Sequence, residues 1–162
     1  MRRARFWLAA AGLGGVLLFT SFSPSQTQTR VAAAYKMEPV AETRLIMEGL
    51  TKPNFDGLAK LLKQQPTEAD SWTFARGQAL LVAESGNLLM LRPPKTKAAQ
   101  DVWLARAAEV REAGVKVARA AGTKNFPEAR VALTEMVNAC NRCHSSFAVK
   151  TRLTAAADEG DK

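Results

Sequence analysis

This chain of 162 residues has few of the side chains that most often carry catalysis or bind metals. It contains one histidine, two cysteines and one tyrosine. A structural zinc site takes four protein ligands, and histidine and cysteine together supply only three here. Any chemistry that depends on sulfur or imidazole is therefore confined to wherever these three side chains lie.

Strand patterns are also missing. The sequence has few β-branched runs and no alternation of polar and apolar residues, and Ala, Leu, Glu, Lys and Arg dominate it. Such composition favours helices over sheets. A chain of this length with 47% hydrophobic residues is long enough and apolar enough for one folded domain. No internal repeat of the solenoid kind is present, so we predict a single all-α domain.

Basic residues exceed acidic ones, but not in a nucleic-acid-binding pattern. The formal net charge is +8, from 23 Lys and Arg against 15 Asp and Glu. Four of the basic residues lie in the first thirty positions, which carry no acid, and this leaves 19 against 15 in the rest. No Lys/Arg cluster is interleaved with aromatics. We therefore predict no nucleic-acid partner and a mild preference for an acidic protein partner.

The N-terminus has the layout of an export signal. Basic residues come first, an apolar run extends from Phe6 to Phe19, and a Ser/Thr/Gln stretch follows. The run of about fourteen residues is shorter than the roughly 20 that a membrane-spanning helix needs. We predict that residues 1–30 are an export signal or a membrane anchor, with cleavage between about residues 20 and 34 favoured. The protein would then work in the periplasm, with only an uncleaved segment touching the membrane.

Prolines and turn residues divide the rest of the chain into four predicted helical segments. The first runs over 34–50 and ends before "TKPN", where Pro53 forms a turn and Asn54 caps the next helix. The second covers 55–92 and is broken or kinked at Pro66. The third and fourth cover 96–121 and 126–149, with Pro127 suited to a first helical turn. A polar tail is predicted over 151–162.

The last two segments have apolar positions at helical spacing. The third repeats at Trp103, Ala107, Val110, Gly114 and Val117, as one buried helix face requires. Four amphipathic helices with short connections pack most economically as an antiparallel four-helix bundle, predicted here over residues 31–150. Three helices with a helical hairpin extension remain the alternative. The fourth segment has its stripe at Phe126, Arg130, Leu133, Val137, Cys140, His144 and Phe147.

The pentapeptide "CNRCH" holds Cys140, Cys143 and His144, which are all the cysteine and histidine of the chain. C-x-x-C-H is the pattern for covalent attachment of haem c. On a helix both thiols lie one turn apart on one side, where they can bond the two vinyl groups along a porphyrin edge. His144 then projects from the same face toward the iron. We predict one covalently bound haem c, with His144 as the proximal ligand.

Three other interpretations of the motif compete. A redox disulfide of the C-x-x-C type expects a βαβ context, which the helical sequence lacks. Zinc lacks a fourth protein ligand. Two buried cysteines beside a core histidine would leave unpaired thiols in an exported protein, which is unusual.

The motif lies near the C-terminus, within the last predicted helix, and an aromatic follows it in "CNRCHSSF". In this the chain resembles the cytochrome c′ family of four-helix bundles. The resemblance also includes the "KPNFDGL" turn and "FPEARVALTEMVNACNRCHSSF", and it extends over residues 34–150. It implies haem c on the last helix. Many members carry a basic residue where this chain has Ala148.

The sixth iron ligand decides between two functions. With no second histidine, the candidates are a Met sulfur, a Lys amine, water or nothing. The resemblance implies a Met ligand near the start of the first helix in low-spin relatives, and Met37 has the matching place. A methionine at such a position also packs in a core, and that interpretation stays open. Met ligation suits electron transfer, and an open iron suits binding of a small gas.

We therefore expect a cytochrome that carries single electrons between redox partner proteins and is not an enzyme. The alternatives are a five-coordinate haem protein that binds NO or CO, and a helical interaction module in which "CNRCH" is incidental. A homodimer is left open. Arg44 is a candidate partner for the haem propionates, or a surface residue. The aromatics that could pack the haem, or simply the core, are Trp72, Phe74, Trp103, Phe126 and Phe147.

Overall fold

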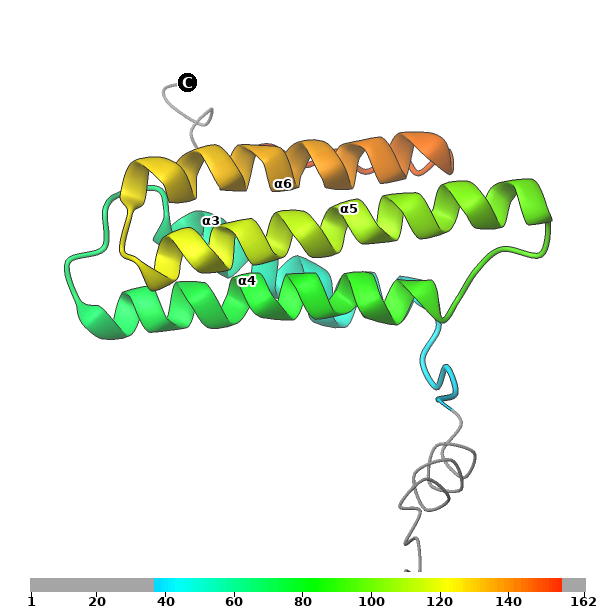
Figure 1. Ribbon diagram of the computed structural model, residues 1–162, viewed down its shortest axis with the longest axis horizontal. Coiled ribbons are helices and arrows are strands. Elements are labelled where there is room, and N and C mark those ends of the chain that lie inside the picture. Colours follow the sequence, from blue (N-terminus) through cyan, green and yellow to red (C-terminus); the bar gives the residue numbers. More distant parts are fainter. Residues whose placement is uncertain (1–36, 156–162) are drawn as a thin grey trace, which may run out of the picture. The chain divides into compact units, whose positions relative to one another are not determined.

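The computed structural model describes residues 37–155, and all regular structure in that range is helical (Figure 1). The chain divides into two units, Met1–Met37 and Glu38–Lys162. The second contains four helices and, within the described residues, no strand, which confirms the all-α prediction. The first helix joins α2 (Thr43–Ile46), η1 (Met47–Thr51) and α3 (Lys52–Leu61), and the others are α4 (Ala69–Met90), α5 (Lys97–Gly122) and α6 (Phe126–Ser146).

The prediction that the first helix ends before Pro53 is wrong, because the helix continues through it. Proline has no N–H and its ring clashes with the carbonyl four residues earlier, so it kinks or breaks a regular α-helix. Here the turn before it widens into the π-helix η1, and the N–H of Lys52 bonds the carbonyl of Met47, five residues back. Asn54 caps nothing: its Nδ2 donates to the Leu50 carbonyl at 2.7 Å.

The first helix also begins later than predicted. Residues 34–36 lie outside the described range, and residues 37–42 are not helical. Pro39 is the physical reason, since it lacks an N–H and disfavours the α conformation of the residue before it. Met37 therefore precedes the first helix, and the prediction that it lies within that helix is wrong.

The break at Pro66 separates the first helix from α4, so residues 55–92 do not form one interrupted segment. The indole Nε1 of Trp72 donates to the Pro66 carbonyl at 2.9 Å and ties the connection to the start of α4. The last two helices begin where they were predicted to begin: α5 starts at Lys97, one residue after the predicted start, and α6 starts at Phe126 as predicted. Among the described residues, no helix is long and apolar enough to cross a membrane.

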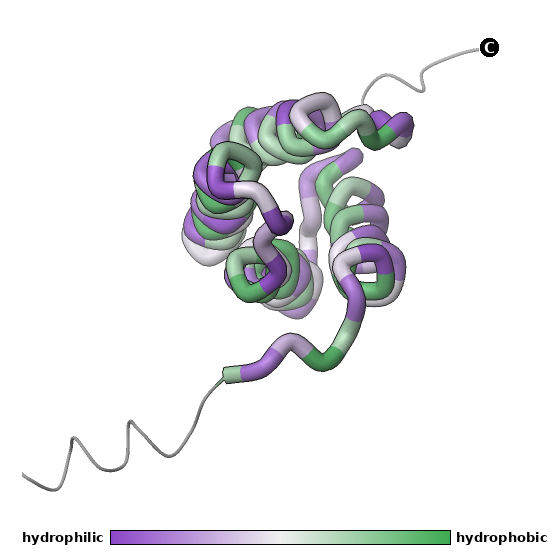
Figure 2. Tube along the Cα trace, turned by 90° about the vertical axis from the view of Figure 1, so that its right-hand side faces the viewer, coloured by the Kyte–Doolittle hydropathy of each residue, from purple (hydrophilic) through white to green (hydrophobic). Residues whose placement is uncertain are grey.

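The helices α4, α5 and α6 lie side by side, and α3 packs on α4 (Figure 1). Viewed along their axes, the helices carry hydrophobic residues on some sides and hydrophilic residues on others (Figure 2). Glycines let α4 and α5 approach closely: a Cβ added at Gly114 would lie 2.8 Å from the Ala83 side chain, and one at Gly86 would lie 2.8 Å from the Ala107 carbonyl. The α5 stripe is confirmed as buried at Ala107, Val110, Gly114 and Val117.

Three polar contacts fix α6 against its neighbours. Glu109 of α5 accepts from Nε of Arg142 at 3.0 Å, and Nζ of Lys116 lies 2.7 Å from Glu135. At the other end of α6, Nη1 of Arg130 donates to the carbonyl of Leu62, just past α3, at 3.0 Å. The apolar cluster that they surround includes Leu58, Leu133, Met136 and Cys140.

Candidate functional site

The "CNRCH" segment lies on α6, a helix whose start is well specified. Asn125 is the N-cap: its Oδ1 accepts from the N–H of Glu128 at 3.2 Å, and Pro127 falls in the first turn. The helix then runs without interruption to Ser146. Because helical residues recur every 3.6 positions, Cys140, Cys143 and His144 share one face. The structure thus brings together the three predicted site residues of the motif.

Both cysteines are free, and burial disfavours their thiolates. Cys140 is 7% exposed and belongs to the apolar core, whereas Cys143 is half-buried. Desolvation, with a smaller contribution from Cys143, raises the pKa of the Cys140 thiol to about 11, and desolvation also raises the pKa of Cys143. Redox C-x-x-C motifs have a lowered thiol pKa. The electrostatics therefore argue against the disulfide oxidoreductase interpretation.

The ring of His144 is held by a backbone group. Its Nδ1 lies 2.9 Å from the carbonyl oxygen of Thr151. A carbonyl oxygen can only accept, so Nδ1 carries the proton and the lone pair of the neutral ring is on Nε2. Histidines that ligate metals usually donate their second N–H to a carbonyl or carboxylate in this way. No pattern in the sequence predicts this contact.

The contact exists because the chain reverses after α6. The N–H of Ala148 bonds the Ser145 carbonyl at 3.4 Å and that of Val149 bonds the His144 carbonyl at 2.8 Å. This is a Schellman turn, and Ala148 occupies its left-handed position with φ 55°. Residues 148–155, the C-terminal strap, then run back beside α6.

Asn141, inside the motif, binds the strap at two points. Its Nδ2 donates to the Leu153 carbonyl at 2.8 Å, and its Oδ1 accepts from the Leu153 N–H at 2.9 Å. The side chains of Leu153 and Ala155 pack against the apolar core. Of the polar tail predicted over 151–162, residues 151–155 belong to this strap, and the remainder lies outside the described residues.

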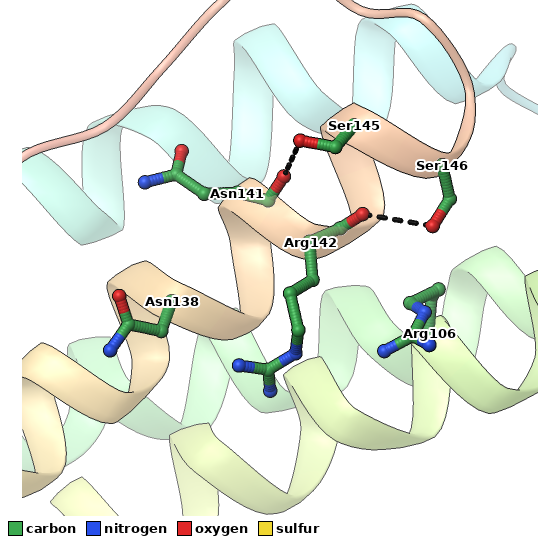
Figure 3. A pocket seen from close by; sticks show the side chains of 6 residues that line it. All are labelled: Arg106, Asn138, Asn141, Arg142, Ser145 and Ser146. Carbon is green, nitrogen blue, oxygen red and sulfur yellow. Dashed lines mark hydrogen bonds between the residues drawn. The ribbon is translucent and has the colours of Figure 1, made fainter.

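Polar side chains of α5 and α6 line a depression beside the motif (Figure 3). Arg106 of α5 faces Arg142 across it, and both guanidinium groups donate to Glu109. Desolvation opposes ionisation of Glu109, but the hydrogen bonds from Arg142 and Arg106 outweigh it, so the pKa of this carboxyl is lowered. The charges that line it act on the motif's thiols: Arg106 opposes part of the rise in the pKa of Cys143, and Arg142 does the same for Cys140. The lining residues are Arg106, Asn138, Asn141, Arg142, Ser145 and Ser146.

Aromatic residues have three different environments. Phe147, next to the motif, makes an edge-on contact with Trp103 at 5.0 Å between ring centroids, and Nε1 of Trp103 donates to the Leu89 carbonyl. Trp72 is buried and Phe126 is partly buried against the core. Phe74 is 61% exposed, so its predicted place in a core is wrong.

Two residues predicted near the haem are exposed. The side chain of Arg44 is 80% exposed and pairs with Glu48, as the surface alternative expects. The side chain of Met37 is 72% exposed and belongs to the unit Met1–Met37. The structure therefore groups the three residues of the motif alone, and ligation by Met37 stays a prediction.

Over residues 37–155, no group of three or more His, Cys, Asp or Glu side chains is arranged to hold a metal ion by itself. Comparison of the chain with protein-family models, with curated proteins and with solved structures gave no match. The assignment of function consequently rests on the residues of the motif and their surroundings.

Proposed function

We propose that this protein is an exported, periplasmic monohaem c-type cytochrome of the cytochrome c′ type, which carries single electrons and converts no substrate itself. The observation that carries the proposal is the state of His144. Its Nδ1–H is engaged by the Thr151 carbonyl, so Nε2 is the free lone pair at the end of a C-x-x-C-H helix.

The residues present fit haem c by their donor chemistry. Two free thiols three positions apart on one helix suit two thioether bonds, and an imidazole with a free Nε2 suits one axial ligand. Cys140 and Cys143 would tether the macrocycle, and His144 would hold the iron. When bound, haem supplies a reversible one-electron Fe(III)/Fe(II) couple. The half-buried positions of Cys143 and His144 support a redox group near the surface.

The packing of α6 also supports the proposal. Its backbone lies close to α5 along an extended interface, whereas no comparable interface joins it to α2 or η1. A flat group beside the motif would therefore not have to separate two tightly packed helices. The pairing of Glu109 with Arg142 and of Lys116 with Glu135 supports the antiparallel order, because partner numbers rise on α5 as they fall on α6.

Charge near the motif supports an acidic redox partner. Arg142, Lys150 and Arg152 are exposed around the C-terminal end of α6. Glu109 offsets part of this charge, because it accepts hydrogen bonds from Arg142 and from Arg106 of α5. Such a basic region would favour encounter with an acidic protein surface at low salt.

The alternative is a five-coordinate haem protein that binds small gases such as NO or CO. One observation favours it: Met37 is exposed and precedes the first helix, so the predicted thioether ligand does not lie on that helix. In that case the sixth position would be open to an external diatomic ligand.

Mass spectrometry of the protein exported by a host with haem c maturation machinery tests the proposal. We expect a mass increase of one haem that survives denaturation, together with the mass of the cleaved N-terminus. The double variant Cys140→Ser, Cys143→Ser is the control and should lose the covalent adduct. Free thiols or a disulfide in the wild type, with no porphyrin absorbance, would overturn the assignment.

The optical spectrum of Met37→Ala separates the two functions. If Met37 binds the iron, the wild type is low-spin with a thioether-to-iron charge-transfer band that the variant loses. Met47→Ala in η1 is the matched control and should leave the band unchanged. A high-spin wild type that takes up CO without displacing a protein ligand would favour the gas-binding function.

A further inference from the structure

The proposed function uses the contact between His144 and the Thr151 carbonyl but leaves open what holds the C-terminal strap in place. Beyond the two backbone bonds of its turn, three hydrogen bonds join the strap to α6: one from His144 to Thr151, and two between Asn141 and Leu153. The acceptor for His144 is a backbone carbonyl, so no side chain at position 151 determines it. What places that carbonyl is the path of the strap.

The geometry points to Asn141 as the positioning residue of the site: it pins the strap so that the Thr151 carbonyl fixes the ring orientation and the tautomer of His144. This inference rests on the proposed function for its consequence at the iron. The amide of Asn141 is suited to the role because it offers a donor and an acceptor at once, and Leu153 uses both.

Two features show that the strap is anchored at its ends. The Schellman turn at Ala148 directs the chain back along α6, and the side chains of Leu153 and Ala155 pack on the apolar core. Between these anchors, Thr151 has little freedom to move relative to α6. Asn141 lies one turn before Ser145 and on the strap side of the motif, so its loss would release the carbonyl without removing any group of the iron site.

The consequence at a metal would be electronic. A ligating imidazole that donates its second N–H is more basic toward the metal, which stabilises the oxidised state. Release of the Thr151 carbonyl should therefore raise the reduction potential. A merely structural role for Asn141 would change the stability of the fold and leave the potential unchanged.

The experiment compares Asn141→Ala with Asn138→Ala in the full chain labelled with [15N]histidine. Asn138 is the matched control, because it lies on α6 three positions earlier, is exposed and belongs to the same polar depression. The chain has one histidine, so every imidazole signal belongs to His144. Circular dichroism verifies that each variant keeps its helices.

In the haem-bearing protein, we expect the Nδ1–H of His144 to exchange with solvent about tenfold faster in Asn141→Ala, the order expected from two lost hydrogen bonds. We also expect a higher reduction potential, and neither change in Asn138→Ala. A chain ending at Lys150 should reproduce both changes, and one ending at Ala155 should match the wild type. Unchanged exchange in both Asn141→Ala and the chain ending at Lys150 would overturn the inference.

The same chain made without haem separates this inference from the proposed function. There the imidazole 15N shifts report the tautomer at pH 8, and we expect Nδ1–H in the wild type but the ordinary Nε2–H form in Asn141→Ala. If the protein never binds haem yet shows this change of tautomer, the proposed cytochrome function is refuted and the positioning role of Asn141 is supported. If the protein binds haem but the tautomer of His144 does not depend on Asn141, the proposed function is supported and the positioning role is refuted.

Discussion

The interface between α4 and α5 and the connection between α6 and the first helix are built in different ways. The first is held by close backbone approach, with Gly86 and Gly114 placed where any Cβ would collide with the facing helix. The second has apolar side chains at wider backbone separation and a single polar tie, from Arg130 to the Leu62 carbonyl. The motif lies on α6, and the strap runs back beside that helix.

The α4–α5 interface is therefore rigid, whereas the contact between α6 and the first helix can repack. Small residues at close range leave no room for change, because packed interiors do not absorb added volume. The backbone of α6 lies close to α5 on one side, and on the other side α6 meets the first helix through side chains, which can repack while α6 keeps its position on α5. The Cys140–His144 motif lies on α6, which among the described helices has a close backbone interface with α5 alone.

The largest effect is expected where the tight interface is overfilled. An added Cβ at Gly114 would lie 2.8 Å from Ala83 and 2.9 Å from the Ala79 carbonyl, and the backbone cannot yield cheaply. Gly114→Leu should lower the free energy of unfolding by about 3 kcal/mol or more, as measured by urea denaturation.

Gly77→Ala provides the matched control in α4, since no heavy atom lies within 4 Å of its added Cβ. It should raise the free energy of unfolding by about 0.5–1 kcal/mol through lower backbone entropy. Similar effects at both glycines would contradict the contrast between the two regions.

A smaller effect is expected at the turn into the strap. Ala148 has φ 55°, which costs an L residue about 1–2 kcal/mol and costs glycine nothing. Part of that gain is lost to the greater freedom of glycine in the unfolded chain. Ala148→Gly should thus stabilise the fold by roughly 0.5–1 kcal/mol in thermal unfolding.

The opposite sign is expected for Ala105→Gly, because Ala105 is exposed in the interior of α5 and has no special backbone conformation. There glycine should destabilise by about 0.5–1 kcal/mol. If Ala148→Gly and Ala105→Gly destabilise the fold equally, Ala148 does not have the left-handed conformation of a Schellman turn.

The smallest effect concerns Glu109, which joins α5 to α6 through Arg142. Because hydrogen bonds from two arginines lower its pKa despite desolvation, the carboxylate stabilises the folded state above its unfolded pKa of about 4.3. That contribution is lost as the pH falls through the lower folded value. Glu109→Gln should cost at most about 1 kcal/mol at pH 7, a difference that disappears in acid.

Glu112→Gln is the control for this pH dependence. Glu112 lies 3.7 Å from Arg111 and its side chain is 67% exposed, so its replacement should change stability little at any pH. Chemical denaturation between pH 3 and 7 measures both variants. A Glu109 effect that grows in acid would contradict the assigned ion pair.

The sequence predicted α5 and α6 well because their signals are local. Pro127 marks the start of α6, and apolar residues repeat at helical spacing in both helices. The first helix was mispredicted for a physical reason. Pro53 normally breaks a helix, but a widened π-turn accommodates it at the cost of one extra residue per turn. Only the three-dimensional path reveals which of the two solutions the chain adopts.

The site was predictable in part for the same reason. Cys140, Cys143 and His144 are neighbours in sequence, so helix geometry alone places them together. The strap was not predicted, because its turn uses Ala148 where glycine is the usual signal. The contact of Asn141 with Leu153 joins polar groups twelve positions apart, and no periodicity marks such a pair.

The two ion pairs between α5 and α6 have a consequence for alignment along the helix axes. Both helices bury many alanines, whose methyl groups distinguish poorly between neighbouring axial positions. The pairs are spaced seven residues apart on each helix, so a slide of one turn would place Lys116 opposite Val131 or Ala139. The two ion pairs thus select one axial alignment of α6 on α5 from several that pack about equally well. The same alignment determines which turn of α5 lies beside the motif.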